Sequence, residues 1–342
     1  MPMNTANIQN AYSIVDTTLI PHPTFQRVVD RIGQCFNAMT SSSDPVCLAI
    51  IGESRTGKSR ALEQFEIDHP IRRLSDGIRA PFVRIRVPSK PTVKGLAEIL
   101  LHKLGDPLYH KGTENAKTLR LIQLLNENQT VILALDEFQH FYDKTTRRVQ
   151  HHVADWLKVL VDDSQIGLVV TGLPSCLSVI QQNEQLMGRF MAPVQMIRFD
   201  WLIEDQQDGF VGILSGMQEA LNMFEMPDFE SDEMAFRFYC ATGGLIGYLT
   251  KILKQAVWNA IDAGQRKIDL QDLAQAYLET VVAVEQHLRA TPNPFLPEFQ
   301  TNPDEALLAR VRAIGLPKTE DPPPPTKRKA PPPRISEVLS TK

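Results

Sequence analysis

The sequence predicts an α/β fold: a five-stranded parallel sheet between two layers of helices, followed by a smaller helical domain. Two apolar runs carry the prediction of the sheet. The run at residues 46–51 leads directly into a glycine-rich turn, and the run at residues 130–135 ends in two acidic residues. Uninterrupted apolar runs of this length, separated by helical patterns, are typical of strands buried in a parallel sheet. After residue 200 only helical patterns recur, which indicates the second, helical domain.

The glycine-rich turn has the pattern of a phosphate-binding loop. Residues 52–59 fit G-x-x-x-x-G-K-[ST], and an apolar strand precedes them, as such a loop requires. In this pattern backbone N–H groups and the positive end of the next helix face the phosphates, Lys58 reaches the β- and γ-phosphates, and Ser59 ligates Mg²⁺. The expected nucleotide-binding residues are Gly52, Glu53, Ser54, Arg55, Thr56, Gly57, Lys58, Ser59 and Arg60. The alternative is a strand-to-helix turn without a ligand.

The acidic pair Asp136-Glu137 has the pattern of a Walker B motif. Asp136 is expected to hold the hydration shell of Mg²⁺, and Glu137 to polarise the water that attacks the γ-phosphorus. The pair lies 78 residues after Lys58, which leaves room for the helices and the strand that right-handed crossovers between parallel strands need. A solvated acidic turn is the alternative. Together the two motifs predict an ATPase that uses ATP and Mg²⁺.

Composition sets the broad class of the chain. Its 342 residues, 43% of them hydrophobic, suggest two domains with a sizeable core. No apolar stretch approaches the length of a membrane span, and no secretory signal pattern opens the chain, so a cytoplasmic protein without a membrane partner is expected. The four cysteines lie far apart and are expected to be reduced core thiols. A net charge of -4 gives no global attraction to nucleic acid, so DNA binding would need a local basic patch.

The elements of the first domain follow in order from local patterns. Residues 1–20 lack clear periodicity and are expected to form an arm, and the nucleotide-binding domain is placed at 21–200. A helix after Pro23 ends at a turn cluster that precedes the first strand. Residues 82–87 alternate with period two, as in a strand with one basic face, and Pro88 ends that strand. Further helices are expected at 60–69, 92–104, 115–128 and 147–161, and further strands at 167–171 and 195–199.

The second domain and the end of the chain differ in composition. Residues 201–290 are expected to form a helical lid, with helices at 205–221, 231–240, 245–261 and 270–287. Residues 291–342 contain proline runs and the basic segment at 327–329, which predicts a disordered or polyproline II tail. This tail is either an inert solvated segment or an arm that docks its apolar residues 335–339 on a partner.

These features together resemble the AAA+ ATPases. More narrowly, the chain looks like the transposition regulators of the TniB/TnsC family, including those that work beside CRISPR effectors. The resemblance covers roughly residues 20–290. The segments that carry it are GESRTGKS (52–59), LDEFQHF (135–141), VVTGLP (169–174), MGRF (187–190) and TGGLIGYL (242–249).

The resemblance implies further catalytic roles. Thr171, at the end of its strand, matches sensor 1, whose hydroxyl bonds the γ-phosphate or the attacking water; a core or capping threonine is the alternative. Arg189 matches the arginine finger, which acts on the nucleotide of a neighbouring subunit, with Arg198 as the competing candidate. Gly247 and Tyr248 stand where the lid often carries an arginine, so Lys251 or Lys254 would have to substitute, or hydrolysis is slow and ATP acts chiefly as an assembly switch.

The resemblance also implies partners. They are double-stranded DNA bound without sequence preference, further copies in an ATP-dependent ring or helical oligomer, transposase subunits, and a target-selection factor of the TniQ type. The best match to the DNA-contacting segment is 89–94, in which Lys90 and Lys94 would contact phosphates and Thr92 would cap the next helix. Secondary candidates are Lys103, Arg147 and Arg148. The alternative for each is a solvated surface cation.

Three functions remain open on the sequence alone. The first is a DNA-binding ATPase that assembles on a target, recruits a transposase and disassembles on hydrolysis. The second is a helicase loader or replication-initiator relative with the same ATP site. The third is an ATP-gated interaction switch of the signalling type without DNA contact. The family resemblance favours the first.

Overall fold

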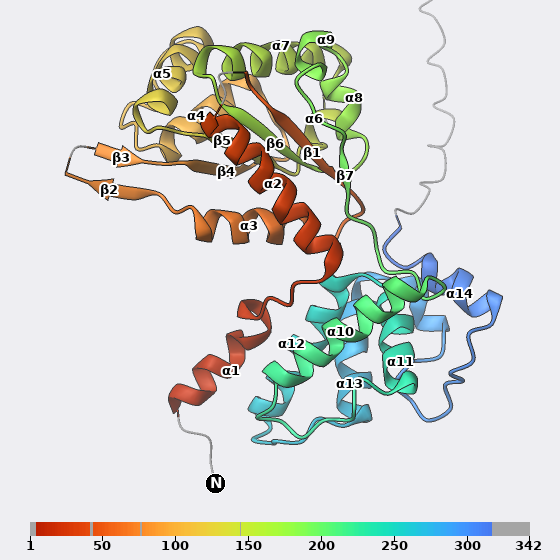
Figure 1. The fold of residues 1–342 in the computed structure, drawn as a ribbon. Coiled ribbons are helices and arrows are strands. Elements are labelled where there is room, and N and C mark those ends of the chain that lie inside the picture. Colours follow the sequence, from red (N-terminus) through yellow and green to blue (C-terminus); the bar gives the residue numbers. More distant parts are fainter. Residues whose placement is uncertain (1–4, 42–43, 76, 144, 317–342) are drawn as a thin grey trace, which may run out of the picture.

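The structure of the chain is a computed structural model that describes residues 5–41, 44–75, 77–143 and 145–316. It has two parts joined at a narrow waist: an α/β domain with the central sheet and a helical domain (Figure 1). The five strands of the sheet are all parallel and lie in the order β4-β5-β6-β1-β7. Their bounds are β1 Cys47–Ile51, β4 Phe82–Arg86, β5 Ile132–Asp136, β6 Gly167–Gly172 and β7 Val194–Gln195. The predicted α/β class is confirmed.

Register places the functional residues at one edge of the sheet. Ile51 lies opposite Gly172, and Arg86 lies opposite Asp136, so neighbouring strands end together. The carboxyl edge therefore carries the phosphate-binding loop after β1, the acidic pair at the end of β5 and Thr171 in β6. This is the edge at which parallel α/β sheets bind ligands.

Alternating strand residues pack two helical layers onto the sheet. Leu48 and Ile50 of β1 face the helices α2 and α3, whereas Ala49 and Ile51 face α4, α5 and α7 (Figure 1). A two-sided core of this kind explains why the strands read as continuous apolar runs. The helices of this domain are α2 Pro23–Ser41, α3 Lys58–Asp68, α4 Val93–Lys103, α5 Glu114–Glu127, α6 His140–Asp143, α7 Arg147–Ser164, α8 Cys176–Ile180 and α9 Glu184–Met187.

The helical domain has a core of its own around α10 to α14. Phe210, Phe238, Tyr248 and Phe295 are fully buried there. Its elements are α10 Glu204–Ala220, α11 Asp232–Thr242, α12 Ile246–Asp262, α13 Leu270–Tyr277, a π-helical turn Leu278–Val282, a 3-10 turn Gln286–Ala290 and α14 Glu305–Arg312. No helix in the described ranges is both long and apolar enough to cross a membrane.

Three expectations about the ends of the domains are wrong. The expected arm contains the helix α1, Thr5–Thr17, which packs on α12 because Ala11 and Val15 point into the helical domain. The predicted tail begins too early: residues 291–316 are folded onto the helical domain, with Phe295 and Val311 buried, and the rest of that predicted tail, 317–342, lies outside the described residues. The predicted last helix of the lid continues from α13 through the π-helical turn and ends at residue 284, three residues before its predicted end.

Two differences concern strands. The fifth strand is shorter than predicted, because β7 spans only Val194–Gln195 and the chain then turns toward the helical domain. A hairpin of β2 Arg72–Leu74 and β3 Gly77–Arg79 projects from the start of β4 and was not predicted at all (Figure 1).

Candidate nucleotide site

The loop after β1 has the backbone geometry that binding of phosphates requires. Gly57 has a φ of 103°, and Arg55 a φ of 69°, so the loop turns through the left-handed region just before α3 begins. Gly52 leaves no room for a side chain, since a Cβ there would lie 1.9 Å from the carbonyl oxygen of Met196. Glycine is therefore required for packing at residue 52 and for conformation at residue 57.

Lys58 lies folded over this loop. Its Nζ donates to the carbonyl oxygens of Gly52 at 2.9 Å and Glu53 at 2.5 Å. Burial lowers the pKa of the Lys58 ammonium, while the nearby carboxylates Glu137 and Asp136 oppose that shift. A phosphate that approached the loop would offer the ammonium a far stronger acceptor than the two carbonyl groups.

A cavity of about 690 Å³ opens beside the loop, between the two domains. This volume is in the range of nucleotide-sized ligand pockets, roughly 300–1,000 Å³. One end is polar and includes residues 54–60, Asp136 and Glu137, and the other is apolar. The apolar wall consists of Val15, Leu19, Ile20, Phe25, Ile213, Met217 and Ile246. The cavity thus has a polar end on the sheet and an apolar end against the helical domain.

Asp136 and Thr171 meet at the polar end. The Thr171 hydroxyl donates to Asp136 Oδ1 at 2.5 Å, and both side chains are buried. The Glu137 backbone N–H also donates to Asp136 Oδ1, at 2.9 Å. Thr171 and Asp136, the expected sensor and magnesium-site residue, are therefore brought together, while the second carboxylate oxygen of Asp136 faces the Arg84 guanidinium at 3.9 Å.

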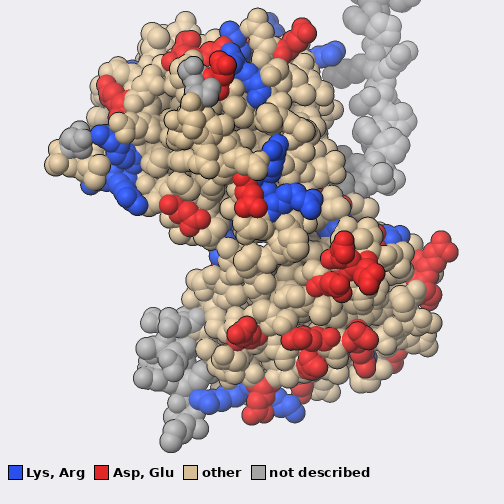
Figure 2. Space-filling model, in the orientation of Figure 1, with Lys and Arg blue, Asp and Glu red and all other residues tan. Residues whose placement is uncertain are grey.

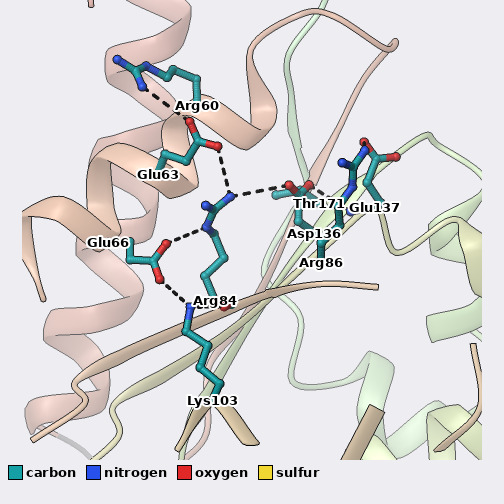
Figure 3. A network of polar contacts seen from close by, with 9 residues as sticks. All are labelled: Arg60, Glu63, Glu66, Arg84, Arg86, Lys103, Asp136, Glu137 and Thr171. Atoms are coloured by element: carbon teal, nitrogen blue, oxygen red, sulfur yellow. Dashed lines mark hydrogen bonds and ion pairs between the residues drawn. The ribbon is translucent and has the colours of Figure 1, made fainter. Parts of the chain in front are cut away.

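Glu137 occupies an unusual backbone position beside this pair. Its φ is 58°, in the left-handed region that side chains other than Gly and Asn adopt at a cost. The carboxylate pairs with Arg86 Nη2 at 3.4 Å (Figure 3). It also accepts a bond from Gln139 Nε2. The Arg86 side chain is 74% exposed, so this contact is weakly held.

Arg84 was not predicted as a site residue, yet it connects the phosphate-loop helix to the Walker B aspartate. Its Nε bonds Glu66 at 2.8 Å, its Nη1 lies 3.4 Å from Glu63, and the same Nη1 is 3.9 Å from Asp136 Oδ2 (Figure 3). The basic alternation of the strand at 82–87 was the sequence signal for it. Lys103 joins the same network through Glu66 at 2.6 Å, so this candidate DNA contact already has an ion-pair partner.

The helical domain meets the phosphate-binding loop at the start of α12. The Gly247 N–H donates to the Arg55 carbonyl at 2.9 Å, and the Arg55 guanidinium lies 4.6 Å from the centre of the Tyr248 ring. Among the described residues that line the cavity, the cations are Arg55, Lys58 and Arg60, all from the loop and its helix. Lys251 lies over the Tyr248 ring at 5.9 Å, and Lys254 pairs with Asp16. Neither lysine lines the cavity.

The two finger candidates lie in different surroundings. Arg198 Nε bonds Glu53 at 2.7 Å, and Nη1 donates to the carbonyl oxygens of Gly243 at 3.3 Å and Arg312 at 3.0 Å. Arg198 therefore joins the phosphate loop to the helical domain of its own chain, and its side chain is only 11% exposed. Arg189 lies outside the cavity and pairs with Asp162 at 2.7 Å, with a side chain that is 30% exposed.

The segment between α1 and α2 crosses the cavity, and its His22 was also not predicted. The Phe25 N–H donates to His22 Nδ1 at 3.3 Å, and the ring lies edge-on to Phe199 at 5.1 Å. Burial lowers the pKa of His22 to about 4, so the ring is neutral at pH 7. The Pro-His-Pro sequence was the available signal, because a polar side chain directly before a helix is placed to cap it.

The remaining DNA candidates lie where helices begin at the carboxyl edge. Lys90 and Lys94 are exposed, and Thr92 caps α4 by accepting a bond from the Gly95 N–H at 3.0 Å, as predicted. Arg147 and Arg148 are exposed in the first turn of α7. Neither arginine has an ion-pair partner among the residues that the structure describes.

Several solved structures have the same fold. Cdc6p from Pyrobaculum aerophilum matches with a TM-score of 0.59 at 14% identity, over 89% of this chain and 83% of that one. ORC1 from Aeropyrum pernix, solved in complex with DNA, matches with a TM-score of 0.56 at 15% identity, over 82% and 72%. A Walker-type ATPase of Pyrococcus abyssi matches with a TM-score of 0.53 at 15% identity, over 81% and 79%. The strand order, the loop after β1 and the helical lid give this chain the fold of the AAA+ ATPases.

Comparison of the sequence with protein families identifies the family of this chain. The family described as "Bacterial TniB protein" matches residues 11–200, which is more than half of the chain. The chain belongs to the TniB family. No match was found among curated proteins.

Proposed function

We propose that this chain is an ATP-dependent, DNA-binding regulator of transposition that assembles on target DNA and recruits a transposase. The observation that carries the proposal is the nucleotide cavity of a TniB-family chain, whose walls come from both domains. Because one ligand touches both walls, its binding would fix the helical domain against the sheet. An AAA+ chain with its domains fixed is a building block for head-to-tail assembly.

The residues at the polar end of the cavity would have separate roles in binding phosphates, binding Mg²⁺ and orienting water. Loop N–H groups and Lys58 would hold the β- and γ-phosphates, and Ser59 with Asp136 would hold Mg²⁺, which neutralises phosphate charge. The donor set fits that ion, since Mg²⁺ prefers oxygen ligands and the hydroxyl and carboxylate lie at the same edge. Glu137 would orient the attacking water after leaving Arg86, and Thr171 would hold Asp136 in place.

We also propose that this chain hydrolyses ATP slowly. The helical domain contributes no cation to the lining of the cavity among the described residues, so stabilisation of transition-state charge would depend on the loop and on a neighbouring subunit. Arg189 is the proposed residue for that neighbour, and it would have to exchange Asp162 for the phosphate on assembly. ATP then acts as an assembly switch that hydrolysis resets.

The proposed primary DNA contact is the start of α4. Lys90 and Lys94 are exposed at one edge of the sheet and would contact phosphates, while the Thr92 hydroxyl is already used as a helix cap. Arg147 and Arg148 would extend this surface along the same edge. Lys103 is left out of it because of its pair with Glu66.

A second candidate function is that of a replication-initiator or helicase-loader relative. It is favoured by the similarity of the fold to Cdc6p and ORC1, one of which is bound to DNA in its solved structure. Both functions predict ATP and DNA binding and differ in the partner. Transposase subunits and a targeting factor of the TniQ type are the proposed partners here; the residues after 316 are a proposed transposase contact.

Electron microscopy of the purified protein with duplex DNA tests the proposal, with and without a slowly hydrolysed ATP analogue. We expect rings or filaments on DNA only with the analogue, and none for Lys58→Ala. Pull-down of transposase subunits by those assemblies, compared with pull-down of a replicative helicase, then separates the two candidates. Particles that ignore DNA in every condition would contradict both and favour an interaction switch without DNA contact.

A further inference from the structure

The hairpin of β2 and β3 is a basic ribbon at the end of the α/β domain that is remote from the helical domain. Arg72 and Arg73 are exposed, and Figure 2 shows Lys and Arg side chains gathered over these two strands. Neither of the two arginines has an ion-pair partner among the residues that the structure describes. Asp76, the only acidic residue between positions 70 and 80, lies outside those residues.

The register of the hairpin sets two basic residues opposite each other. Arg72 lies directly opposite Arg79 in an antiparallel pair, and like charges in that relation destabilise a sheet. Leu74, two residues from Arg72, is 51% exposed on a ribbon that has no third strand. The hairpin therefore presents two basic side chains across from each other and leaves Leu74 half exposed to solvent.

The hairpin is nevertheless anchored. Ile78 packs against the core under the end of α4, and β3 leads through Ala80 and Pro81 directly into the edge strand β4. The arginines are thus held on a short ribbon that continues the line of β4 beyond the sheet (Figure 1). A ribbon fixed in this way presents its side chains with little further loss of conformational freedom.

The two ends of β4 then carry two basic elements. The hairpin precedes the strand, and the segment with Lys90 and Lys94 follows it. Lys90 comes 11 residues after Arg79, so the backbone separates them by at most about 40 Å. One turn of B-DNA rises by about 34 Å. A duplex that lies along the outer side of strand β4 can therefore present phosphates to both basic elements at once.

We propose that the β2–β3 hairpin is a second DNA-contacting element, which holds the phosphate backbone of a duplex along the edge strand β4. Arginine suits this role because its planar guanidinium binds phosphate oxygens in a bidentate manner. The contact is to phosphates, so it is independent of sequence. The inference rests on the proposed DNA binding and adds to it a surface separate from the start of α4.

The test is to measure the affinity for duplex DNA at several salt concentrations. Fluorescence anisotropy gives the affinity, and a slowly hydrolysed ATP analogue is present throughout. We expect Arg72→Ala/Arg73→Ala to bind more weakly, with the slope of log affinity against log salt shallower by about 1.8, since each phosphate contact contributes about 0.9. Arg72→Lys/Arg73→Lys should keep the wild-type slope because it keeps the charges. Arg27→Ala/Arg289→Ala removes two exposed arginines elsewhere and is the matched control.

Three other outcomes would each contradict the hairpin contact or the proposed function. A hairpin variant that matches the Arg27→Ala/Arg289→Ala control in affinity and slope overturns the hairpin contact and leaves DNA binding by the start of α4 intact. Loss of ATP-dependent assembly by the hairpin variant in the absence of DNA assigns the hairpin to a contact between copies and also overturns the inference. Wild-type protein that binds no duplex overturns the proposed function itself.

Discussion

Glu137 is the residue whose environment says most about turnover. It combines a strained backbone with a weakly held partner, since Arg86 is largely exposed. The Glu137 carboxylate is therefore held by its ion pair with Arg86, but breaking this exposed pair costs little free energy. Asp136, in contrast, is buried and bonded by Thr171 and by a backbone N–H, so its position is fixed before any ligand arrives.

We expect Glu137→Gln to keep ATP binding and to lower turnover by about 10²-fold or more, the usual contribution of a positioned base. The amide keeps the size of the side chain but cannot accept the proton. Phosphate release measures turnover, and sedimentation with DNA should show an assembly that persists with ATP. Asp143→Asn, an exposed acid on α6, is the control for loss of one charge. Normal turnover by Glu137→Gln would mean that another group activates the water.

The neutral His22 makes a specific prediction about pH. Its pKa is lowered to about 4 by burial, while an unfolded histidine titrates near 6.5. Between these pH values the unfolded chain binds the proton and the folded chain does not, so stability falls as the pH falls from about 6.5 toward 4.

The loss attributable to this ring is on the order of 3 kcal/mol at most, at about 1.4 kcal/mol per pKa unit. Chemical denaturation of wild type and His22→Gln across this window measures it. The free energy of unfolding of wild type should decline more steeply with acidity than that of the variant. Parallel declines would place the ring in water rather than in the cavity wall.

At the scale of elements, the contact between α12 and the phosphate-binding loop depends on Gly247. A Cβ at that position would lie 2.8 Å from the Arg55 Cβ, which belongs to a turn with little freedom to move. The start of α12 and the loop therefore touch backbone to backbone. Any side chain at residue 247 would push the helical domain away from the polar end of the cavity.

Gly247→Ala should weaken ATP binding by roughly 5- to 150-fold, the equivalent of about 1–3 kcal/mol for an overpacked contact. Isothermal titration with an ATP analogue measures it. Gly212→Ala is a matched control on α10, because a Cβ there would meet nothing within 4 Å. The control should bind normally and be at least as stable as wild type, since alanine favours a helix. Equal affinities for both variants would show that α12 moves freely.

Elements with a strong local pattern were the ones that the sequence could predict. The Walker motifs are contiguous and follow apolar strands, so the loop at 52–59 and the pair at 136–137 were placed correctly. Helix α1 was missed because its partner is α12, hundreds of residues away, and its own pattern is weak. The hairpin was missed because its strands are short and exposed and show no apolar alternation. Arg84 and Arg198 acquire their roles through partners that only the folded chain brings near.

At the scale of the whole molecule, Arg198 joins three regions that are distant in the sequence. It touches Glu53 in the phosphate-binding loop, Gly243 before α12 and Arg312 at the end of α14. Arg312 in turn pairs with Asp200 at 3.0 Å. Arg198 therefore joins the phosphate-binding loop to the helical domain through polar contacts at the waist.

Arg198→Ala should reduce the rise in melting temperature that a saturating ATP analogue produces, because the bound state no longer gains a fixed domain orientation. Thermal unfolding with and without the analogue measures this difference. Arg189→Ala is the companion variant: it breaks the pair with Asp162 inside the α/β domain, so it should leave that rise unchanged while lowering turnover in assembled protein. A normal rise for Arg198→Ala would contradict a role in holding the domains.

The path of helix α1 has a practical consequence for dissecting this protein. Helix α1 lies on the helical domain, where the Trp258 indole donates to the Tyr12 carbonyl at 3.0 Å; the chain then crosses to build the sheet and returns to the helical domain. A fragment that starts at residue 200 would consequently lack part of the packing of the helical domain, and one that ends there would carry helix α1 without its partner α12. A protease cut near residue 20 should leave both products associated on a sizing column, and only denaturant should separate them.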